Sequence, residues 1–289
     1  MSKPAAKTGA GPTVLVAIEQ FFPKDQRIIQ DEMAYWILPS GLRAFAWLMR
    51  MKALREWMVR KWEESMPGLW AGMTCRKRYI DEKLNESAGR MEAVINLGAG
   101  FDTRTFRLPA LAAMPVWEVD QSENIRPKER RVRAVLGSIP SHLKLVSADF
   151  DRDNLDELLA SHGYSANLKT FFVWEAVSQY LTEAGVRSTF DFFSHAPGGS
   201  QLAFTYIRRD FLEGRNRYGW EKGYDKYVVK DKLWIFGMDP EEWPGFLKPY
   251  GWQVVEDIGA GELNDRYVKP TGRNLASASV ERIIHAAKT

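Results

Sequence analysis

A glycine-rich loop and the carboxylate that follows it are the residues of this sequence best placed for binding chemistry. Gly98 and Gly100 come directly after the short apolar run at residues 93–97. Gly98 permits a tight turn, and Gly100 lets a ligand approach the backbone closely. Asp120 ends the next apolar run, where its carboxylate can accept hydrogen bonds from the two hydroxyls of a ribose. Together these residues predict a nucleoside site, whereas either feature alone would also fit an ordinary strand-to-helix turn.

The residues inside the loop favour S-adenosylmethionine over a dinucleotide. A dinucleotide site carries a third glycine in G-x-G-x-x-G, so that the helix packs close to the pyrophosphate. Here that position is Thr103, and Asp102 stands beside it. A carboxylate would repel a pyrophosphate but is compatible with the sulfonium cation of S-adenosylmethionine. We therefore expect S-adenosylmethionine as the cofactor, and we place Ala99 in the loop and Gln121 after the second run among the residues that bind it.

Two further acids follow apolar runs in the same way. Asp149 follows the run at 143–146 and can reach the amino group of an adenine, whose ring Phe150 can cover. Glu175 follows the run at 170–174 and can meet the ammonium group of the cofactor. Each acid taken singly could instead belong to the first turn of a helix, where the helix dipole stabilises it. Acids that end three neighbouring strands at one edge make binding the stronger interpretation.

The elements that must position these residues alternate along the chain after residue 92. Apolar runs and helical patterns follow one another, which predicts an α/β fold with a mostly parallel sheet covered on both faces. Strands are expected at residues 93–97, 116–119, 143–146, 170–174, 201–206, 252–257 and 277–286, and helices at 103–113, 123–136, 154–162 and 182–195. Carboxyl ends of parallel strands meet at one edge, so the loop and the acids are expected to lie together there.

The chain before the sheet predicts only helices. Residues 13–88 are expected to form a helical cap, with one helix over 69–88 and another over 42–66. Spacings of three and four indicate a single buried face on the latter, made by Leu42, Phe45, Ala46, Met49, Ala53, Trp57 and Met58. Residues 1–12 are expected to be a disordered tail, 207–248 an insertion, and 13–289 a single domain. Eight of the eleven tryptophans fall in the cap and insertion, and we expect them to cover the donor's methyl group.

Composition narrows the function classes. The formal net charge is +3, which gives no global reason to expect a nucleic-acid partner. No apolar run approaches the roughly 18–20 residues of a membrane span, and the first residues lack the apolar core of a signal peptide, so we expect a cytoplasmic protein without stable membrane insertion. The single cysteine, Cys75, forms no internal disulfide, and no His/Cys/Asp cluster has metal-ligand spacing. We expect no bound metal, and the oligomeric state stays open.

Several segments resemble the leucine carboxyl methyltransferase-like family, which includes the polyketide O-methyltransferases. The most specific is NLGAGFDTR at residues 96–104, together with FVWEAV at 172–177 and YLT at 180–182. Weaker similarity is found in DEMA at 31–34, RKRYID at 76–81 and VERIIHAAK at 280–288. The likeness runs from about residue 21 to the end. It implies a Rossmann-like class I methyltransferase, with a seven-stranded sheet, an N-terminal helical cap and an insertion after the fifth strand.

The resemblance also assigns roles to particular residues. An arginine in the helix before the first strand holds the cofactor's carboxylate in this family, and Arg76 matches it best. Gly98 and Gly100 would line the methionine part, with the roles of the acids as given above. Lys77 stands where many bacterial members have threonine. That departure leaves the register of the arginine open, with Arg78 as the alternative.

The acceptor site is expected under the cap and the aromatic-rich insertion. The absence of an obvious general base near the motifs favours O-methylation of a carboxylate, because a carboxylate is already ionised at pH 7. A small, aromatic or polyketide-like acceptor is expected to contact Tyr180, Tyr206, Trp220 and Tyr224, and no catalytic residue is assigned. Two alternatives stay open: methylation of a protein C-terminal carboxylate, and a membrane-surface or partner-binding protein that uses the basic, Trp-rich helices. For these helices we favour packing of their apolar face on the domain.

Overall fold

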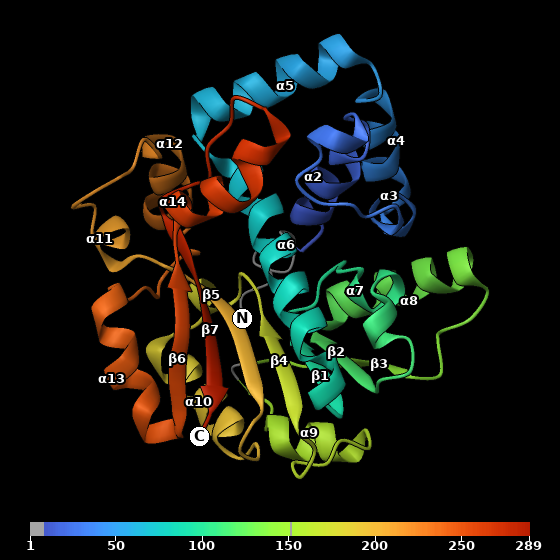
Figure 1. Ribbon diagram of the computed structural model, residues 1–289, viewed down its shortest axis with the longest axis vertical. Coiled ribbons are helices and arrows are strands. Elements are labelled where there is room, and N and C mark those ends of the chain that lie inside the picture. Colours follow the sequence, from blue (N-terminus) through green and yellow to red (C-terminus); the bar gives the residue numbers. More distant parts are fainter. Residues whose placement is uncertain (1–8, 151) are drawn as a thin grey trace.

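The structure, a computed structural model, describes residues 9–150 and 152–289. Its centre is a seven-stranded sheet with the order β3-β2-β1-β4-β5-β7-β6 (Figure 1). The strands from β3 to β5 pair in parallel, and β7 pairs antiparallel with both β5 and β6. The strands are β1 Ala93–Leu97, β2 Val116–Asp120, β3 Leu143–Ser147, β4 Thr170–Trp174, β5 Gln201–Ile207, β6 Trp252–Ile258 and β7 Glu281–Lys288. The α/β class and the mostly parallel seven-stranded sheet are confirmed, although the last strand begins at Glu281 rather than at residue 277.

The strand order reverses beside β1. The chain runs outward from β1 through β2 to β3 and then crosses back to β4, which pairs with the other edge of β1. In sheets of this kind, ligands bind in the crevice at the carboxyl ends of the two strands that flank the reversal. Gly98 directly follows β1 and Glu175 directly follows β4. The topology therefore brings the glycine loop and this acid to one place.

Helices cover both faces of the sheet, as Figure 1 shows. Side chains alternate along each strand, so Phe171 of β4 packs with the α6 side, whereas Phe172 packs with Phe193 of α10 on the other side. The α-helices are α2 Gly11–Glu19, α3 Met33–Ile37, α4 Ser40–Leu48, α5 Lys52–Ser65, α6 Leu69–Ser87, α7 Arg104–Arg107, α8 Ser122–Leu136, α9 Leu155–Ser161, α10 Glu183–Ser194, α11 Arg209–Leu212, α12 Glu221–Tyr224, α13 Trp243–Leu247 and α14 Ala260–Leu263. Of these, α6 matters most for function because it joins the cap to the sheet.

The predicted helix over residues 42–66 is wrong, because the chain forms two helices, α4 and α5, separated by residues 49–51. The buried guanidinium of Arg55 stabilises the break by donating from Nη1 to the carbonyl oxygens of Met49 and Arg50, at 3.0 and 3.3 Å. These carbonyls lie at the end of α4, where no intrahelical donor is left for them. The single buried face expected for this segment is also wrong. Its buried members are Ala46, Met49 and Met58, whereas Leu42, Phe45, Ala53 and Trp57 are exposed.

Two other predicted boundaries are corrected. The helix expected over 103–113 shortens to α7, because Leu108 precedes Pro109 and takes an extended conformation there. A 3₁₀ turn over Pro109–Leu111 follows it. At the N-terminus, residues 1–8 of the expected tail lie outside the described residues. Helix α2 already begins at Gly11, so the cap starts two residues earlier than expected.

Trp243 provides a test of the packing on the face of the sheet that α10 covers. Its side chain is fully buried, with ring centroids of Phe204 and Tyr206 at 4.8 and 5.1 Å. We expect Trp243→Ala to lower the free energy of unfolding by about 3–5 kcal/mol, because it leaves a large cavity. Trp57 is half-exposed, so Trp57→Ala is the matched control and should change that free energy by less than about 0.5 kcal/mol. Urea unfolding followed by circular dichroism measures both, and equal effects would contradict the assignment.

Candidate active site

A cavity of about 290 Å³ lies at the strand reversal. Four parts of the chain form its wall: the N-terminal segment 9–13, one face of α6, the loops after β1 and β4, and the insertion together with the start of β7. Of the residues predicted to bind cofactor or acceptor, seven line this cavity: Arg76, Gly98, Ala99, Gly100, Glu175, Tyr180 and Trp220. The other six do not: Asp120, Gln121, Asp149, Phe150, Tyr206 and Tyr224.

The glycine loop has the backbone that its sequence predicts. Gly98 has a φ of +75°, and a Cβ there would lie 2.1 Å from Cγ2 of Val177. Gly100 has a φ of +45°, and a Cβ there would lie 2.7 Å from the carbonyl oxygen of Gly9. Only glycine fits both positions, because other residues would meet steric overlap as well as an unfavourable φ. The loop thus forms a cradle into which a ligand can approach the main chain.

Asp120 is held beneath this loop. Its Oδ2 accepts a hydrogen bond from the amide of Gly100 at 2.6 Å, and its Oδ1 accepts one from Nδ2 of Asn124 at 3.0 Å. Gly9 packs against both donors. A Cβ added to Gly100 would lie 2.7 Å from the carbonyl oxygen of Gly9, and a Cβ added to Gly9 would lie 2.8 Å from Nδ2 of Asn124. The Asp120 side chain is therefore 3% exposed, and its burial raises the pKa of the carboxyl. The backbone amide of the neighbouring Gln121 donates to Oδ1 of Asp120, and Gln121 also lies outside the cavity wall.

The residues after β3 lie further from the cavity. Phe150 is buried in the hydrophobic core on the α9 side of the sheet, with Leu155 and Leu159 of α9. The Asp149 carboxylate is partly exposed, and Arg152 lies 3.8 Å from it. The structure therefore does not bring these two side chains to the cavity wall, because β3 is the outer strand of this half of the sheet. Their expected contact with an adenine stays a prediction.

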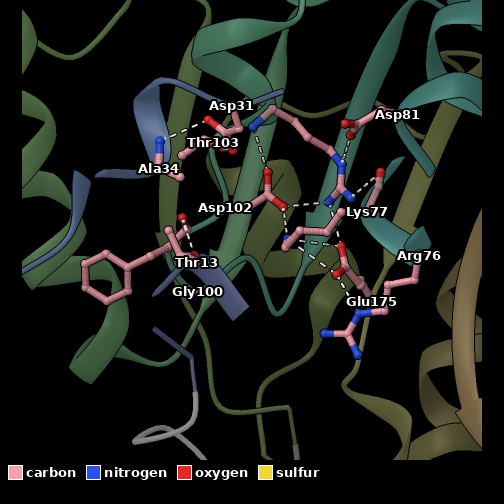
Figure 2. A network of polar contacts seen from close by, with 12 residues as sticks. Thr13, Asp31, Ala34, Arg76, Lys77, Asp81, Gly100, Asp102, Thr103 and Glu175 are labelled. Atoms are coloured by element: carbon pink, nitrogen blue, oxygen red, sulfur yellow. Dashed lines mark hydrogen bonds and ion pairs between the residues drawn. The ribbon is translucent and has the colours of Figure 1, made fainter. Parts of the chain in front are cut away.

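A buried network of charges surrounds Glu175, and Figure 2 shows it from Asp31 and Asp81 to Arg76. The Glu175 carboxylate lies 2.9 Å from Arg76 Nε, 2.7 Å from Arg104 Nη1 and 3.4 Å from Lys77 Nζ. Lys77 and Arg104 also contact Asp102, at 3.1 and 2.6 Å. Glu281 at the start of β7 accepts hydrogen bonds from Arg76 Nη1 at 2.8 and 3.0 Å. The helical cap, the glycine loop and two strands thus meet in one electrostatic cluster.

These charges keep each other ionised. Burial raises the pKa of Glu175, but the charges of Lys77, Arg104 and Arg76 outweigh it and lower that pKa to about 2. In the same way, burial lowers the pKa of Arg76, but the charges of Glu281 and Glu175 outweigh this effect and hold that pKa above its usual range. Asp102 is also held ionised, with its pKa well below the normal value. Its charge is already balanced by protein cations, so the argument for a sulfonium cofactor from Asp102 alone does not hold.

The whole network carries more negative than positive groups. Four cations face five carboxylates, which leaves one uncompensated negative charge: Arg76, Lys77, Arg104 and Arg107 against Asp31, Asp81, Asp102, Glu175 and Glu281. Asp31 and Asp81 lie at the end remote from Glu175, where both contact Arg107. Burial also raises the pKa of Asp31, so the formal excess of one carboxylate belongs to that remote end and not to the cavity wall.

The structure distinguishes the two candidate arginines of the basic triplet. Arg76 lines the cavity, whereas Arg78 points away from it. Nε of Arg78 pairs with Glu82 at 3.0 Å, and its guanidinium lies over the ring of Tyr267 at 4.9 Å. In a helix, residues two apart lie on different faces, which explains the separation. Arg76 is therefore the arginine available to a ligand.

The upper part of the cavity is aromatic and apolar. Tyr227 and Trp234 stack with ring centroids 4.7 Å apart and an interplanar angle of 12°, and Trp220 lies 6.2 Å from Trp234. Nε1 of Trp220 donates to the carbonyl oxygen of Pro67 at 2.7 Å, which ties the insertion to the start of α6. Tyr180 completes this aromatic wall. A flat, apolar ligand can pack against the parts of these rings that face the cavity.

Two residues expected to contact the acceptor lie elsewhere. Tyr206 is fully buried on the opposite face of β5, where its hydroxyl donates to Asp257 at 2.8 Å. Side chains alternate along a strand, so its neighbour Ile207 lines the cavity instead. Tyr224 packs edge-on against Phe211 at 5.7 Å, within the insertion. The expectation that eight tryptophans cover the site is also wrong, because only Trp220 and Trp234 line it.

Sequence reasoning missed several residues of the cavity. Lys77 could have been found, because Met73, Arg76 and Lys77 share one helix face at spacings of three and four. Glu281 could not, because its position follows only from the antiparallel direction of β7, which brings the start of that strand to the carboxyl ends of the others. The N-terminal segment at 9–13 carries no chemical motif, and its contact with the glycine loop is visible only in the fold.

In residues 9–150 and 152–289, no group of three or more His, Cys, Asp or Glu side chains could hold a metal ion. Among the helices of that same part of the chain, none is long and apolar enough to cross a membrane.

Comparison with known proteins identifies the family that this chain resembles. The model of the leucine carboxyl methyltransferase family matches residues 10–194. YktD of Bacillus subtilis, whose name assigns it to the S-adenosyl-L-methionine-dependent methyltransferases, is 28% identical over 223 residues, which cover 74% of this chain and 71% of YktD. A Mycolicibacterium gilvum protein with the same assignment is 29% identical over 274 residues, covering 87% and 86% of the two chains.

Solved structures support the fold at lower identity. A protein of Thermobifida fusca described as a methyltransferase has a TM-score of 0.56 and 14% identity, with 96% of this chain and 94% of that chain covered. An O-methyltransferase family protein of Burkholderia thailandensis has a TM-score of 0.51 and 11% identity, with 97% and 72% covered. At this identity the likeness establishes the Rossmann-like architecture.

The charge network predicts a pH dependence of stability. The pKa of Glu175 falls from 4.5 in the unfolded chain to about 2 in the fold, so its contribution is complete above pH 4.5 and is lost as the pH falls toward 2. We expect Lys77→Met to lower the free energy of unfolding at pH 7 by about 1–3 kcal/mol, because it leaves Glu175 and Asp102 less compensated. The same substitution should cost less at pH 3. Urea unfolding at the two pH values measures the difference.

Lys52→Met is the matched control for this variant. Lys52 is largely exposed and lies 3.8 Å from Glu56, so its removal should leave the free energy of unfolding nearly unchanged at both pH values. An equal loss in the two variants, or a larger loss for Lys77→Met at pH 3 than at pH 7, would contradict the proposed network.

Proposed function

The chain belongs to the leucine carboxyl methyltransferase family and is an S-adenosylmethionine-dependent methyltransferase, and on this premise we propose that it methylates the carboxylate oxygen of a small aromatic or polyketide-like acceptor. The cofactor supplies the methyl group from its sulfonium. The protein's part is to align donor and acceptor and to exclude water, because the reaction is a direct displacement. The single observation that carries the proposal is an aromatic cavity whose acids are too weak as bases to deprotonate a phenol or an alcohol.

The residues of the lower cavity fit the cofactor. The cradle of Gly98, Ala99 and Gly100 admits the methionine part against the main chain, and Glu175 and Arg76 would hold the ammonium and carboxylate groups. S-adenosylmethionine carries two positive groups and one negative group, and the cavity wall offers charges of both signs to pair with them.

The ribose and adenine contacts belong to the same proposal. Asp120 would accept hydrogen bonds from the ribose hydroxyls, with Gln121 beside it, and Asp149 and Phe150 would meet the adenine. Gly9 packs against the residues that donate to Asp120. Access of a ribose to that carboxylate therefore requires the segment at Gly9 to shift. Asp120 is already aligned by Gly100, so little rearrangement of the carboxylate itself is needed.

The acids and phenols of the cavity support a carboxylate acceptor. Glu175, with its pKa of about 2, is too weak a base to accept the proton of a phenol, whose pKa is near 10. Burial raises the pKa of Tyr227, so this side chain stays protonated at neutral pH. None of the four histidines lines the cavity. A carboxylate acceptor needs no base, because it reaches the site already ionised.

The stacked rings support a small planar acceptor over a peptide. Trp220, Tyr227 and Trp234 offer broad apolar faces, whereas recognition of a protein C-terminus requires hydrogen-bond partners for the peptide main chain. Methylation of a protein carboxylate is the second candidate, supported by the family model alone. Mass spectrometry of short peptides and small aromatic acids as parallel acceptors discriminates the two.

Asp120→Ala tests the cofactor site. We expect the variant to bind S-adenosylhomocysteine at least about tenfold more weakly, because hydrogen bonds to a charged group contribute about 1.5–3 kcal/mol. Isothermal titration calorimetry measures the affinity, and a thermal melt shows whether the fold is intact. Asp191→Ala is the matched control, since Asp191 is an exposed acid on α10. Unchanged affinity in Asp120→Ala would overturn the ribose assignment.

The type of methyl product tests the acceptor class. With labelled S-adenosylmethionine and matched aromatic acids and phenols, we expect label only in the acids, as methyl esters that release methanol in alkali. The rate should vary little between about pH 6 and pH 9, because the acceptor is ionised throughout. Trp234→Ala should raise the KM for the acid about tenfold or more and affect the KM for the cofactor less. Alkali-stable methyl ethers would refute the carboxylate proposal.

A further inference from the structure

The exposed apolar residues of this protein are concentrated in one short stretch. Eleven large apolar side chains are exposed among the described residues, and seven of them lie between positions 36 and 57. Scattered single residues of this kind need no explanation, but a group carried by three successive helices marks a candidate binding surface. The members of this group, the α4–α5 surface, are Trp36, Leu42, Phe45, Trp47, Leu48, Met51 and Trp57.

Helix α4 contacts α2 and α3 but buries little of its own surface against them. Of its nine residues only Ala46 is buried, although the helix is apolar nearly all round. Trp47 is 52% exposed and Trp57 is 50% exposed, and within residues 9–150 and 152–289 neither has a ring contact. A helix with apolar residues on every side is normally buried. The surface therefore lacks a covering partner.

Basic side chains surround these apolar residues. Five basic residues between positions 36 and 65 are at least partly exposed, against three acids, Glu56, Glu63 and Glu64: Arg43, Arg50, Lys52, Arg60 and Lys61. Lys52 pairs with Glu56 at 3.8 Å and Lys61 with Glu64 at 2.7 Å, so the excess positive charge lies with the arginines. Arg131 of α8 joins them from a neighbouring element, because its Nη2 donates to the carbonyl oxygen of Trp36 at 2.6 Å. Arg55 takes no part, because its guanidinium is buried against the end of α4. The covering partner must therefore be both apolar and negatively charged.

We propose that the α4–α5 surface docks the enzyme onto an anionic lipid bilayer. Tryptophan, leucine and methionine beside lysine and arginine suit the boundary between headgroups and acyl chains, where both kinds of side chain are satisfied. A second copy of this chain fits less well, because a twofold interface would bring the basic residues of one patch against those of the other. Nucleic acid offers the charge but no apolar layer for seven exposed side chains. Binding is peripheral.

The position of this surface gives docking a consequence. Figure 1 shows α4 and α5 beyond the carboxyl ends of the parallel strands, at the end of the molecule that holds the cavity. Helix α5 packs directly on α6, whose other residues line that cavity. Docking through α4 and α5 would therefore turn the cavity end of the enzyme toward the bilayer. Docking through this surface requires no particular methyl acceptor.

Vesicle flotation of the full chain tests the proposal. We expect the protein to float with vesicles of equimolar phosphatidylglycerol and phosphatidylcholine and to stay unbound with phosphatidylcholine alone. Trp47→Ala combined with Trp57→Ala should abolish flotation. Arg50→Ala should weaken binding about fivefold, because each basic residue near such a surface contributes about that factor. Absence of binding to the anionic vesicles would overturn the proposal.

Matched controls separate this surface from general effects. Val255 is 59% exposed and Lys144 is exposed, and both lie outside the patch, so Val255→Ala and Lys144→Ala should leave flotation unchanged. Thermal melts and S-adenosylhomocysteine titration of the double tryptophan variant show that its fold and cofactor site persist. Sedimentation velocity tests the alternative partner, a second copy of the chain. If the unchanged chain is a dimer that binds no vesicles, and the double variant is a monomer, the surface joins two copies instead.

Discussion

The Glu175 carboxylate and its three cations form the interaction on which the rest of the site depends. A buried carboxylate is tolerated only when charges and hydrogen bonds replace the water it has lost. Here those charges come from α6 and from Arg104, the first residue of α7 after the glycine loop, so satisfying one acid at the end of β4 fixes three elements relative to each other. The cavity has its shape because these elements cannot separate without leaving that charge unpaired.

Helix α6 meets this constraint because its faces have different partners. Cys75, Tyr79 and Ile80 pack with the apolar residues of one sheet face, while Arg76 and Lys77 extend into the cavity. Apolar burial positions the helix, and the ion pairs then set the position of its charged side chains. The result is a preformed pattern of charges that does not need to assemble when a ligand arrives. Preorganisation of this kind reduces the cost of binding.

The sequence contains enough local information for the sheet and the glycine loop but not for every side chain of the site. Strands and the loop follow from short-range patterns, and the structure confirms them from β1 to β5. The face of the sheet on which Tyr206 lies depends on the register of β5. A shift of one residue would move its side chain from the core to the cavity. The contact of Arg76 with Glu281 joins residues 205 positions apart, and no local pattern encodes it. The break between α4 and α5 likewise depends on the buried guanidinium of Arg55.

The net charge of +3 hides two opposed regions, and this changes what composition can exclude. The network around Glu175 has five carboxylates and four cations, whereas the residues around the α4–α5 surface, between positions 36 and 65, include five exposed or partly exposed basic residues and three acids. A value near zero therefore argues against a uniformly charged protein, but not against a local basic surface, because attraction to a bilayer falls off within about a Debye length. The aromatic residues divide in the same way. Trp220 and Trp234 face the cavity, Trp47 and Trp57 face solvent, and only the cavity pair can act on an acceptor directly.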